Sequence, residues 1–289
     1  MKIKDLLNEE KVTMSFEVFP PKTSAAFEEV DTAVYKLAAL KPDFMSVTYG
    51  AGGGTSAHTV RITSDIYQKY GVNSMAHLSC VSSTREEVHA MLDEIDRHGI
   101  ENVLALRGDI PKNWTFPLPN QYRYASELIY DIKESHPHLC IGGACYPEGH
   151  PESANKTEDI LHLKEKVDAG CEFLTSQMFF DNDIFYNFLY RVREKGVTVP
   201  VIAGIMPVTS GKQIVRITQL SGTYLPSRFK AIVDRFGNDP AAMKQAGIVY
   251  ASEQIIDLIA NGVNHIHVYT MNKPEVAAAI RTNLSEMIG

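Results

Sequence analysis

The sequence predicts an α/β protein, built as a single (β/α)8 TIM barrel over residues 1–289. Eight runs rich in Val, Ile, Phe, Thr and Tyr recur along the chain, amphipathic helix-length segments separate them, and the repeat is about 30 residues, the length of a βαβ unit. An open doubly wound sheet is the alternative, but it usually has fewer strands and a Gly-rich first turn, whereas the first turn here reads FPPKTS.

The elements follow in order along the chain. The predicted strands cover residues 12–20, 44–50, 74–80, 102–108, 140–147, 173–180, 199–208 and 265–272. Segments such as TREEVHAMLDEIDRHGI carry apolar residues at three- and four-residue spacing, and several end in a glycine that suits a helix C-terminus: Gly99, Gly170, Gly196 and Gly262. The longer stretch 209–262 predicts extra helices between strands seven and eight.

Composition excludes several classes of partner. Lys and Arg total 28 against 35 Asp and Glu, and this net charge of −7 gives no basic surface for nucleic acid or anionic lipid. No apolar run reaches the ~20 residues that span a bilayer, and the charged N-terminus is neither a secretory nor a transit peptide, so we expect a cytoplasmic protein. The cysteines are interpreted as buried apolar residues, since a metal or redox site lacks ligand spacing: Cys80, Cys140, Cys145 and Cys171.

In a barrel of this kind, function lies where strands end and βα loops begin. Glu17 is the most informative residue at this rim. Alternation along its strand puts Met14, Phe16 and Val18 on the helix-facing side, so Glu17 points into the barrel mouth. A buried acid is costly, which leaves two readings: a functional group, or a structural partner of an inward Arg or Lys.

Other rim motifs are weaker. The glycine-rich stretch 49–56 suits close backbone approach to a ligand, but it also reads as a flexible loop. Arg107 and Asp109 flank Gly108 at a strand end, where they form either a ligand site or a local ion pair. His77 and His150 lie on the same rim, and each is a candidate for function or for a satisfied hydrogen-bonding role.

Two absences narrow the chemistry. No predicted strand contains Lys, which disfavours Schiff-base catalysis. His265 and His267 face the same way on the last strand, but no carboxylate ligand lies beside them, so the sequence predicts no metal site. Chemistry beyond proton transfer would need an organic cofactor.

The motifs SFEVFPPKT, SVTYGA, AHLSC, ALRGD, YPEGHPE, KVDAG, TSQMFFD, GIMPV and VYTMNK are similar in order and spacing to those of the bacterial methylenetetrahydrofolate reductases. The resemblance covers nearly the whole chain. It implies non-covalent FAD at the C-terminal rim, reduction of that flavin by NADH or NADPH in a ping-pong cycle, and reduction of 5,10-methylenetetrahydrofolate to 5-methyltetrahydrofolate. This is a step of one-carbon metabolism and methionine biosynthesis.

The resemblance also implies roles for individual residues. Glu17 matches the general acid, and Asp109 the acid that meets the pterin. Positions matching flavin contacts are Thr48, Tyr49, Ala51, His77, Arg107, Gly108, Asp109, Tyr124, Ala125, Tyr146, His150, Asp159 and Lys166. Positions matching substrate contacts are Gln177, Gln213 and Lys273.

The chain departs from the family pattern at several positions. Ile217 replaces a stacking Phe found in some members, and Lys273 replaces an Arg, exchanging a planar fork for a point charge. His162 and Glu165 stand where an Asn and an Arg are expected at the adenosine end, so the prediction leaves them out of the site. Because the chain stops soon after the eighth strand, we expect no C-terminal S-adenosylmethionine-binding domain.

Two rival functions remain open: a flavin-free barrel lyase or hydrolase, and a barrel that binds a pterin without turnover. The sequence does not decide between NADH and NADPH, and it leaves the oligomeric state and any electron-delivering partner subunit open.

Overall fold

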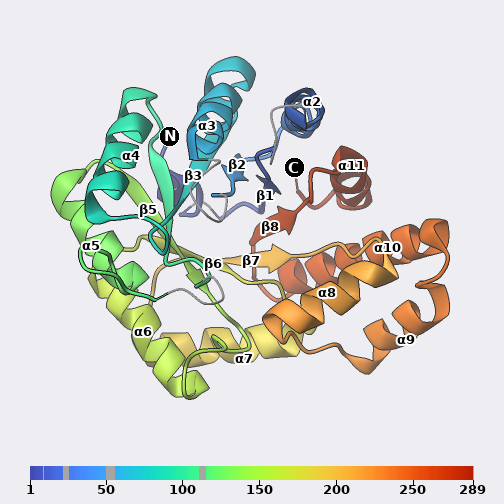
Figure 1. The fold of residues 1–289 in the computed structure, drawn as a ribbon. Helices are drawn as coiled ribbons and strands as arrows, with labels where there is room; N and C mark the ends of the chain where they lie inside the picture. The colour runs from blue at the N-terminus through green and yellow to red at the C-terminus, as the bar shows by residue number, and fades with distance from the viewer. Residues whose placement is uncertain (9, 22–25, 50–55, 111–114, 289) are drawn as a thin grey trace.

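The computed structural model describes residues 1–8, 10–21, 26–49, 56–110 and 115–288. Its strands form one closed parallel barrel in sequential order, surrounded by helices (Figure 1). The strands are β1 (Thr13–Val18), β2 (Phe44–Val47), β3 (Asn73–Ser79), β4 (Asn102–Leu106), β5 (Cys140–Cys145), β6 (Phe173–Ser176), β7 (Val201–Ile205) and β8 (His265–Tyr269). The predicted (β/α)8 barrel is confirmed. The predicted runs extend beyond the strand ends because they include the first residues of the following loops.

The helices alternate with the strands. They are α1 (Ile3–Leu6), α2 (Phe27–Ala38), α3 (Ser56–Tyr70), α4 (Arg85–Arg97), α5 (Ala125–Ser135), α6 (Lys156–Asp168), α7 (Asn182–Glu194), α8 (Gly211–Ser221), α9 (Ser227–Phe236), α10 (Pro240–Ala260) and α11 (Pro274–Asn283). The extra helices predicted between β7 and β8 are confirmed: α8, α9 and α10 lie together on one side of the barrel, with α10 against α7 and α11 (Figure 1). No helix in the described part of the chain is long and apolar enough to cross a membrane.

The alternation of β1 sorts its side chains as predicted. Met14, Phe16 and Val18 join the apolar layer between the sheet and the helices, where α2 contributes Val30 and Val34. The intervening residues Thr13, Ser15 and Glu17 are buried on the other face, inside the barrel. One face of β1 therefore packs against the helices, and the other face points into the barrel interior.

The barrel interior is layered from bottom to top. Apolar side chains fill the half nearest the N-terminal ends of the strands, and α1 packs Ile3 and Leu7 against them; the strand residues are Phe44, Met75, Leu104, Cys140, Phe173 and Ile202. Polar side chains, among them those of Ser46, His77 and His267, replace them further up. The apolar plug leaves only the upper mouth of the barrel for a ligand.

Tyr269 spans this mouth from β8. Its hydroxyl donates to the carbonyl oxygen of Ser176 on β6, at 2.6 Å. A Cβ at Gly204, on the intervening strand β7, would lie 2.2 Å from that carbonyl oxygen and 2.7 Å from the Tyr269 hydroxyl. Glycine at this position is therefore what allows the tyrosine to cross the barrel.

Candidate active site

A cavity of about 660 Å³ opens at the C-terminal ends of β2 to β6. The strands and their loops form its floor, and the first turns of α5 and one face of α6 form its wall. All the described positions matched to flavin contacts line it: Thr48, Tyr49, His77, Arg107, Gly108, Asp109, Tyr124, Ala125, Tyr146, His150, Asp159 and Lys166. Gln177 lines it as well, whereas Ala51 lies outside the described residues.

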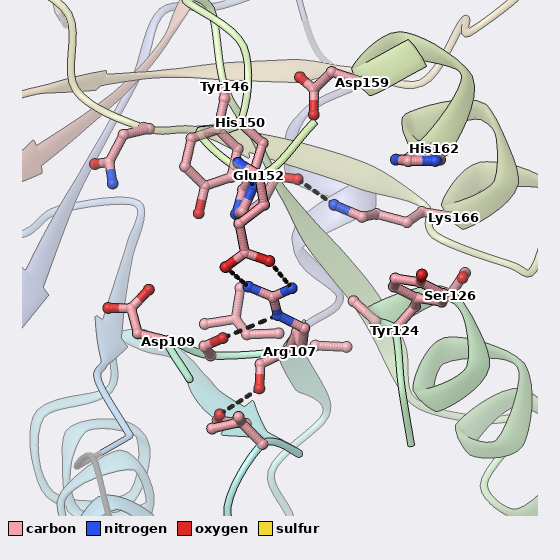
Figure 2. A pocket seen from close by; sticks show the side chains of 18 of the residues that line it. Arg107, Asp109, Tyr124, Ser126, Tyr146, His150, Glu152, Asp159, His162 and Lys166 are labelled. Carbon is pink, nitrogen blue, oxygen red and sulfur yellow. Dashed lines mark hydrogen bonds and ion pairs between the residues drawn. The ribbon is translucent and has the colours of Figure 1, made fainter. Parts of the chain in front are cut away.

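Arg107 and Glu152 face each other across the centre of the cavity (Figure 2). The two guanidinium nitrogens Nη1 and Nη2 donate to the two carboxylate oxygens at 2.6 and 2.7 Å, a bidentate pair. The hydrogen bond from Arg107 lowers the pKa of Glu152, and the same bond raises the pKa of Arg107. The alternative prediction that ALRGD forms a local Arg107–Asp109 ion pair is wrong. Arg107 pairs instead with Glu152, which lies in the loop after β5.

Gly108 holds this part of the floor in shape. Its φ of +87° lies in the left-handed region, and a Cβ there would lie 2.2 Å from Ser79 Oγ. That hydroxyl donates to the carbonyl oxygen of Arg107 at 2.9 Å. The close approach of β3 and β4 at this point therefore requires glycine.

One face of α6 forms the far wall. Asn155 caps the helix by accepting hydrogen bonds from the amides of Thr157 and Glu158, both at 3.0 Å. Asp159 accepts from Ser153 Oγ at 3.1 Å, and Lys166 donates to the carbonyl oxygen of Ala144 at 2.9 Å. Burial lowers the pKa of Lys166.

The loop after β5 carries an aromatic pair. Tyr146 and His150 meet edge to face with ring centroids 4.7 Å apart. Burial, followed by the nearby charge of Arg107, lowers the pKa of His150. Burial, followed by the charge of Asp109, raises the pKa of Tyr146 to about 12. Both rings therefore stay neutral near pH 7 and offer hydrogen bonding without charge.

Glu17 lies inside the barrel, with 7% of its surface exposed. Two imidazoles approach its Oε2 atom: His77 Nε2 at 3.7 Å and His267 Nε2 at 3.9 Å. Both distances exceed those of a hydrogen bond. Among the described residues no Lys or Arg forms an ion pair with Glu17.

The two histidines beside Glu17 are held differently. His267 is hydrogen bonded through Nδ1 to Ser15 Oγ at 2.7 Å and through Nε2 to Ser46 Oγ at 3.2 Å. His77 Nε2 is buried and has no hydrogen-bond partner within the described chain. Burial lowers the pKa of His77 to about 4, although the charge of Glu17 acts in the opposite direction.

The remaining predicted substrate contacts lie apart from the cavity lining. Gln213 and Lys273 meet at Thr209: Lys273 Nζ donates to its hydroxyl at 2.7 Å, and Gln213 Oε1 accepts from its amide at 3.2 Å. Ile217 is buried in an apolar cluster with Phe180 and Phe229. These residues and Glu17 are absent from the residues that line the 660 Å³ cavity.

Several lining residues were missed or excluded by sequence reasoning. No local sequence pattern predicts Glu152 as a site residue, because its partner Arg107 is far away in the sequence. His162 and Glu165 were left out, but both line the cavity. Helical spacing predicts that His162 belongs to the site, because Asp159, His162 and Lys166 follow one another at three- and four-residue intervals and share a face of α6.

The chain matches the family model "Methylenetetrahydrofolate reductase" over residues 2–285. It is 34% identical to the 5,10-methylenetetrahydrofolate reductases of Pectobacterium carotovorum and Escherichia coli over 270 residues, which is 93% of this chain and 89% and 90% of those proteins. It is 33% identical to "Methylenetetrahydrofolate reductase (NADH) 1" of Zea mays over 98% of this chain and 50% of that protein. The chain thus spans about half the length of the plant relative.

Solved structures share the fold at low identity. A Clostridium thermocellum protein, described as binding two copies of 5-methyl-5,6,7,8-tetrahydrofolic acid, superposes with a TM-score of 0.62 at 15% identity, with 99% of each chain covered. An oxaloacetate acetylhydrolase superposes with a TM-score of 0.54 at 12% identity, covering 99% of this chain and 84% of that one. At these identities the likeness is one of fold.

Proposed function

The chain belongs to the methylenetetrahydrofolate reductase family, and we propose that it reduces 5,10-methylenetetrahydrofolate to 5-methyltetrahydrofolate with a flavin and NADH or NADPH. One observation carries the flavin part of the proposal. The described positions that match flavin contacts are spread from residue 48 to residue 166, yet they line a single cavity. Residues assembled for unrelated structural reasons would not converge in this way.

The cavity fits such a cofactor. Its volume of about 660 Å³ lies within the range of roughly 300–1,000 Å³ for small-molecule sites. Arg107 and Lys166 supply cationic groups for an anionic ligand, and Gly108 lets the backbone line the floor without a side chain. His77 Nε2, which is buried without a partner, is the kind of polar atom that a bound ligand satisfies.

We infer FAD instead of FMN because the lining extends past the strand ends to α6, where Asp159, His162 and Lys166 contribute to it. This length of wall suits a second, adenosine half of the cofactor. Heat-released cofactor identified as FMN by chromatography would contradict this assignment.

When bound, the flavin would supply the hydride that reduces the methylene carbon. The rest of the chemistry falls to side chains of this chain. A methylene group bridging two nitrogens is a poor hydride acceptor until one nitrogen is protonated and the ring opens to an iminium cation. Glu17 would donate that proton, and Asp109 would favour the cation through its negative charge.

The surroundings of Glu17 support its role as an acid. It is buried without a Lys or Arg partner among the described residues, and the imidazole of His77 beside it is neutral near pH 7. A buried carboxyl group whose described neighbours carry no fixed positive charge suits the role of a general acid.

An anaerobic titration tests the proposal. The purified protein should be yellow with a flavin spectrum, NADH or NADPH should bleach it, and methylenetetrahydrofolate should restore the colour. A colourless protein would favour the flavin-free lyase or hydrolase, and bleaching that folate does not reverse would favour a barrel that only binds pterin. Initial-rate lines that intersect instead of running parallel would contradict the ping-pong order.

A further inference from the structure

Two aromatic side chains face each other at the α6 end of the cavity. Tyr124 is the residue just before α5, and His162 lies in the second turn of α6. Their ring centroids are 6.4 Å apart, their planes differ by 26°, and both side chains line the cavity (Figure 2). Two flat surfaces therefore border the same end of the cavity.

The spacing of the two rings suits a planar ring between them. Aromatic faces in van der Waals contact lie ~3.5–4 Å apart, so a ring held between two others needs about 7 Å between the outer pair. The 6.4 Å between Tyr124 and His162 is too wide for close contact and falls a little short of that span. Both residues are exposed, so a small movement of either ring would complete the fit.

The two rings differ in how they are held. The Arg123 guanidinium lies 5.2 Å from the centroid of the Tyr124 ring, a cation–π contact, and the Arg123 amide donates to Glu127 Oε2 at 2.8 Å. Tyr124 is therefore anchored at the start of α5. Among the described residues, none forms a hydrogen bond or ion pair with the His162 side chain, which contacts the Tyr124 ring. His162 is thus the ring with freedom to adjust to a ligand.

Cationic groups lie beside this pair of rings. Lys166 is one helical turn beyond His162 on the same face of α6, and Arg107 lies at the centre of the cavity. A ligand that placed a planar ring in the gap and negative charge toward Lys166 and Arg107 would need both a heterocyclic base and phosphate groups. This combination is that of a nucleotide.

We propose that Tyr124 and His162 clamp the adenine ring of FAD between them, an inference that rests on the proposed function. The isoalloxazine ring then lies at the strand ends, where Asp109 and Gln177 line the cavity. His162 stands where the family pattern has an Asn, so in this chain ring stacking takes the place of an amide contact. The clamp acts on binding alone, and it determines the preference for FAD over FMN.

The test compares FAD with FMN, because FMN lacks the adenine that the clamp would hold. Full-length protein is freed of flavin, and the dissociation constants for FAD and FMN are measured from the change in flavin fluorescence. Loss of a ring that stacks on a base weakens binding by about 5- to 150-fold, so His162→Asn should raise the Kd for FAD by at least about fivefold. The Kd for FMN should not change.

Further variants show whether ring stacking is responsible. His162→Phe keeps a planar ring and should retain tight FAD binding. Tyr124→Leu removes the opposing ring and should weaken the binding of FAD but not of FMN. Tyr130→Leu is the matched control, because Tyr130 is an exposed residue of α5 outside the cavity lining, and it should leave both dissociation constants unchanged. Thermal melting establishes that each variant is folded.

ADP tests the clamp without a flavin. It carries the same adenine and diphosphate groups as FAD, so it should compete with FAD for the wild-type protein and bind more weakly to His162→Asn. UDP has a smaller pyrimidine ring and should bind the wild-type protein more weakly than ADP does.

The outcomes separate the clamp from the proposed function. Equal losses of FAD and FMN affinity in His162→Asn, or no loss of either, overturn the clamp but leave a flavin-binding reductase in place. A loss of FAD affinity in His162→Phe as large as that in His162→Asn also overturns it. A wild-type protein that binds neither flavin contradicts the proposed function, and ADP binding that His162→Asn does not weaken then overturns the clamp by itself.

Discussion

The barrel mouth around Glu17 and the rim around Arg107 differ in how their charged side chains are paired and exposed. Glu17 is 7% exposed, and the charged or titratable described groups that approach its Oε2 atom are two imidazoles at 3.7 and 3.9 Å, beyond hydrogen-bond distance. Arg107 and Glu152 have side chains 16% and 52% exposed, and they form a bidentate ion pair. Within the described residues, one region keeps an acid without a Lys or Arg partner, and the other pairs its charges where water reaches them.

The difference separates proton chemistry from binding. When an ionisable group without an ion-pair partner gains or loses a proton, no ion pair is broken. A paired group in partial contact with solvent keeps its charge, and its interactions are weakened by screening. We therefore expect changes inside the barrel to alter a step of the reaction, and changes at the rim to alter affinity and potential.

The largest expected effect comes from Glu17→Gln, which keeps the shape of the side chain but cannot supply a proton. Reoxidation of the reduced flavin by methylenetetrahydrofolate should fall by about 10²- to 10⁴-fold. Reduction by NADH or NADPH should stay within a few-fold of wild type, because that half-reaction needs no proton from Glu17. Stopped-flow traces of both half-reactions make the measurement.

The rim residue Glu152 provides the matched control for this experiment. Glu152→Gln makes the same chemical change in a carboxylate that lines the cavity, and both half-reactions should remain within a few-fold of wild type. Equal losses of the two half-reactions in Glu17→Gln would indicate a structural role for Glu17 and remove the contrast between the two regions.

The sequence contained most of the fold and part of the site. Strand positions follow from local composition and period, and the inward direction of Glu17 follows from alternation along β1, which any strand buried on both faces obeys. The cavity residues came from family resemblance, and their convergence could not be derived from spacing alone. The position matched at Ala51 lies outside the described residues.

What the sequence could not supply is contact between distant loops. Arg107 follows β4 and Glu152 follows β5, and nothing local to either residue selects the other over Asp109, which is two positions from Arg107. The pair of histidines at Glu17 likewise depends on β3 and β8 both facing the barrel interior at the same height. Such relations follow from closure of the barrel and not from a local motif.

Acid sensitivity should expose the buried region a second way. Below the ordinary His pKa of 6.5 and above about 4, the unfolded chain binds a proton at residue 77 that the native protein does not, so stability falls as pH falls. The contribution of His77 across this window is about 3 kcal/mol at most.

Replacing the histidine should remove that dependence. The free energy of unfolding of His77→Gln, measured by denaturant titration at several pH values, should decline less than that of wild type between pH 6.5 and 4. His89→Gln serves as the control, because that ring is part-exposed and contacts Asp131. Parallel curves for wild type and His77→Gln would show that the His77 ring is not buried as a neutral group.

Asp109→Asn probes the rim with a smaller effect. Its negative charge lies on the cavity surface, where it opposes the added electron density of a reduced flavin, so the variant should retain flavin and reduce it at a less negative potential. Folate turnover should fall by about two- to fivefold, since an exposed charge contributes up to ~1 kcal/mol. Spectroelectrochemical titration gives the potential, and an unchanged value would place Asp109 away from the flavin.

The smallest effect is expected for flavin affinity in Glu152→Gln. The carboxylate of Glu152 occupies the guanidinium of Arg107 with two hydrogen bonds, and an anionic ligand that used the same guanidinium would have to displace it. Removing the charge should then tighten FAD binding by up to about fivefold, the equivalent of ~1 kcal/mol for a part-exposed pair.

Glu165→Gln is the matched control, because Glu165 lines the same cavity and no described contact joins it to Arg107. Dilution of the holoenzyme, followed by the recovery of free flavin fluorescence, gives the dissociation constants, and the difference between the two variants should shrink as salt is raised. Weaker binding in Glu152→Gln would instead show that Glu152 holds Arg107 in position for the ligand, and equal changes in both variants would reduce the effect to the net charge of the cavity. A change as large as that expected for Glu17→Gln would remove the distinction between the two regions, because a screened pair at the rim should not match an unpaired acid inside the barrel.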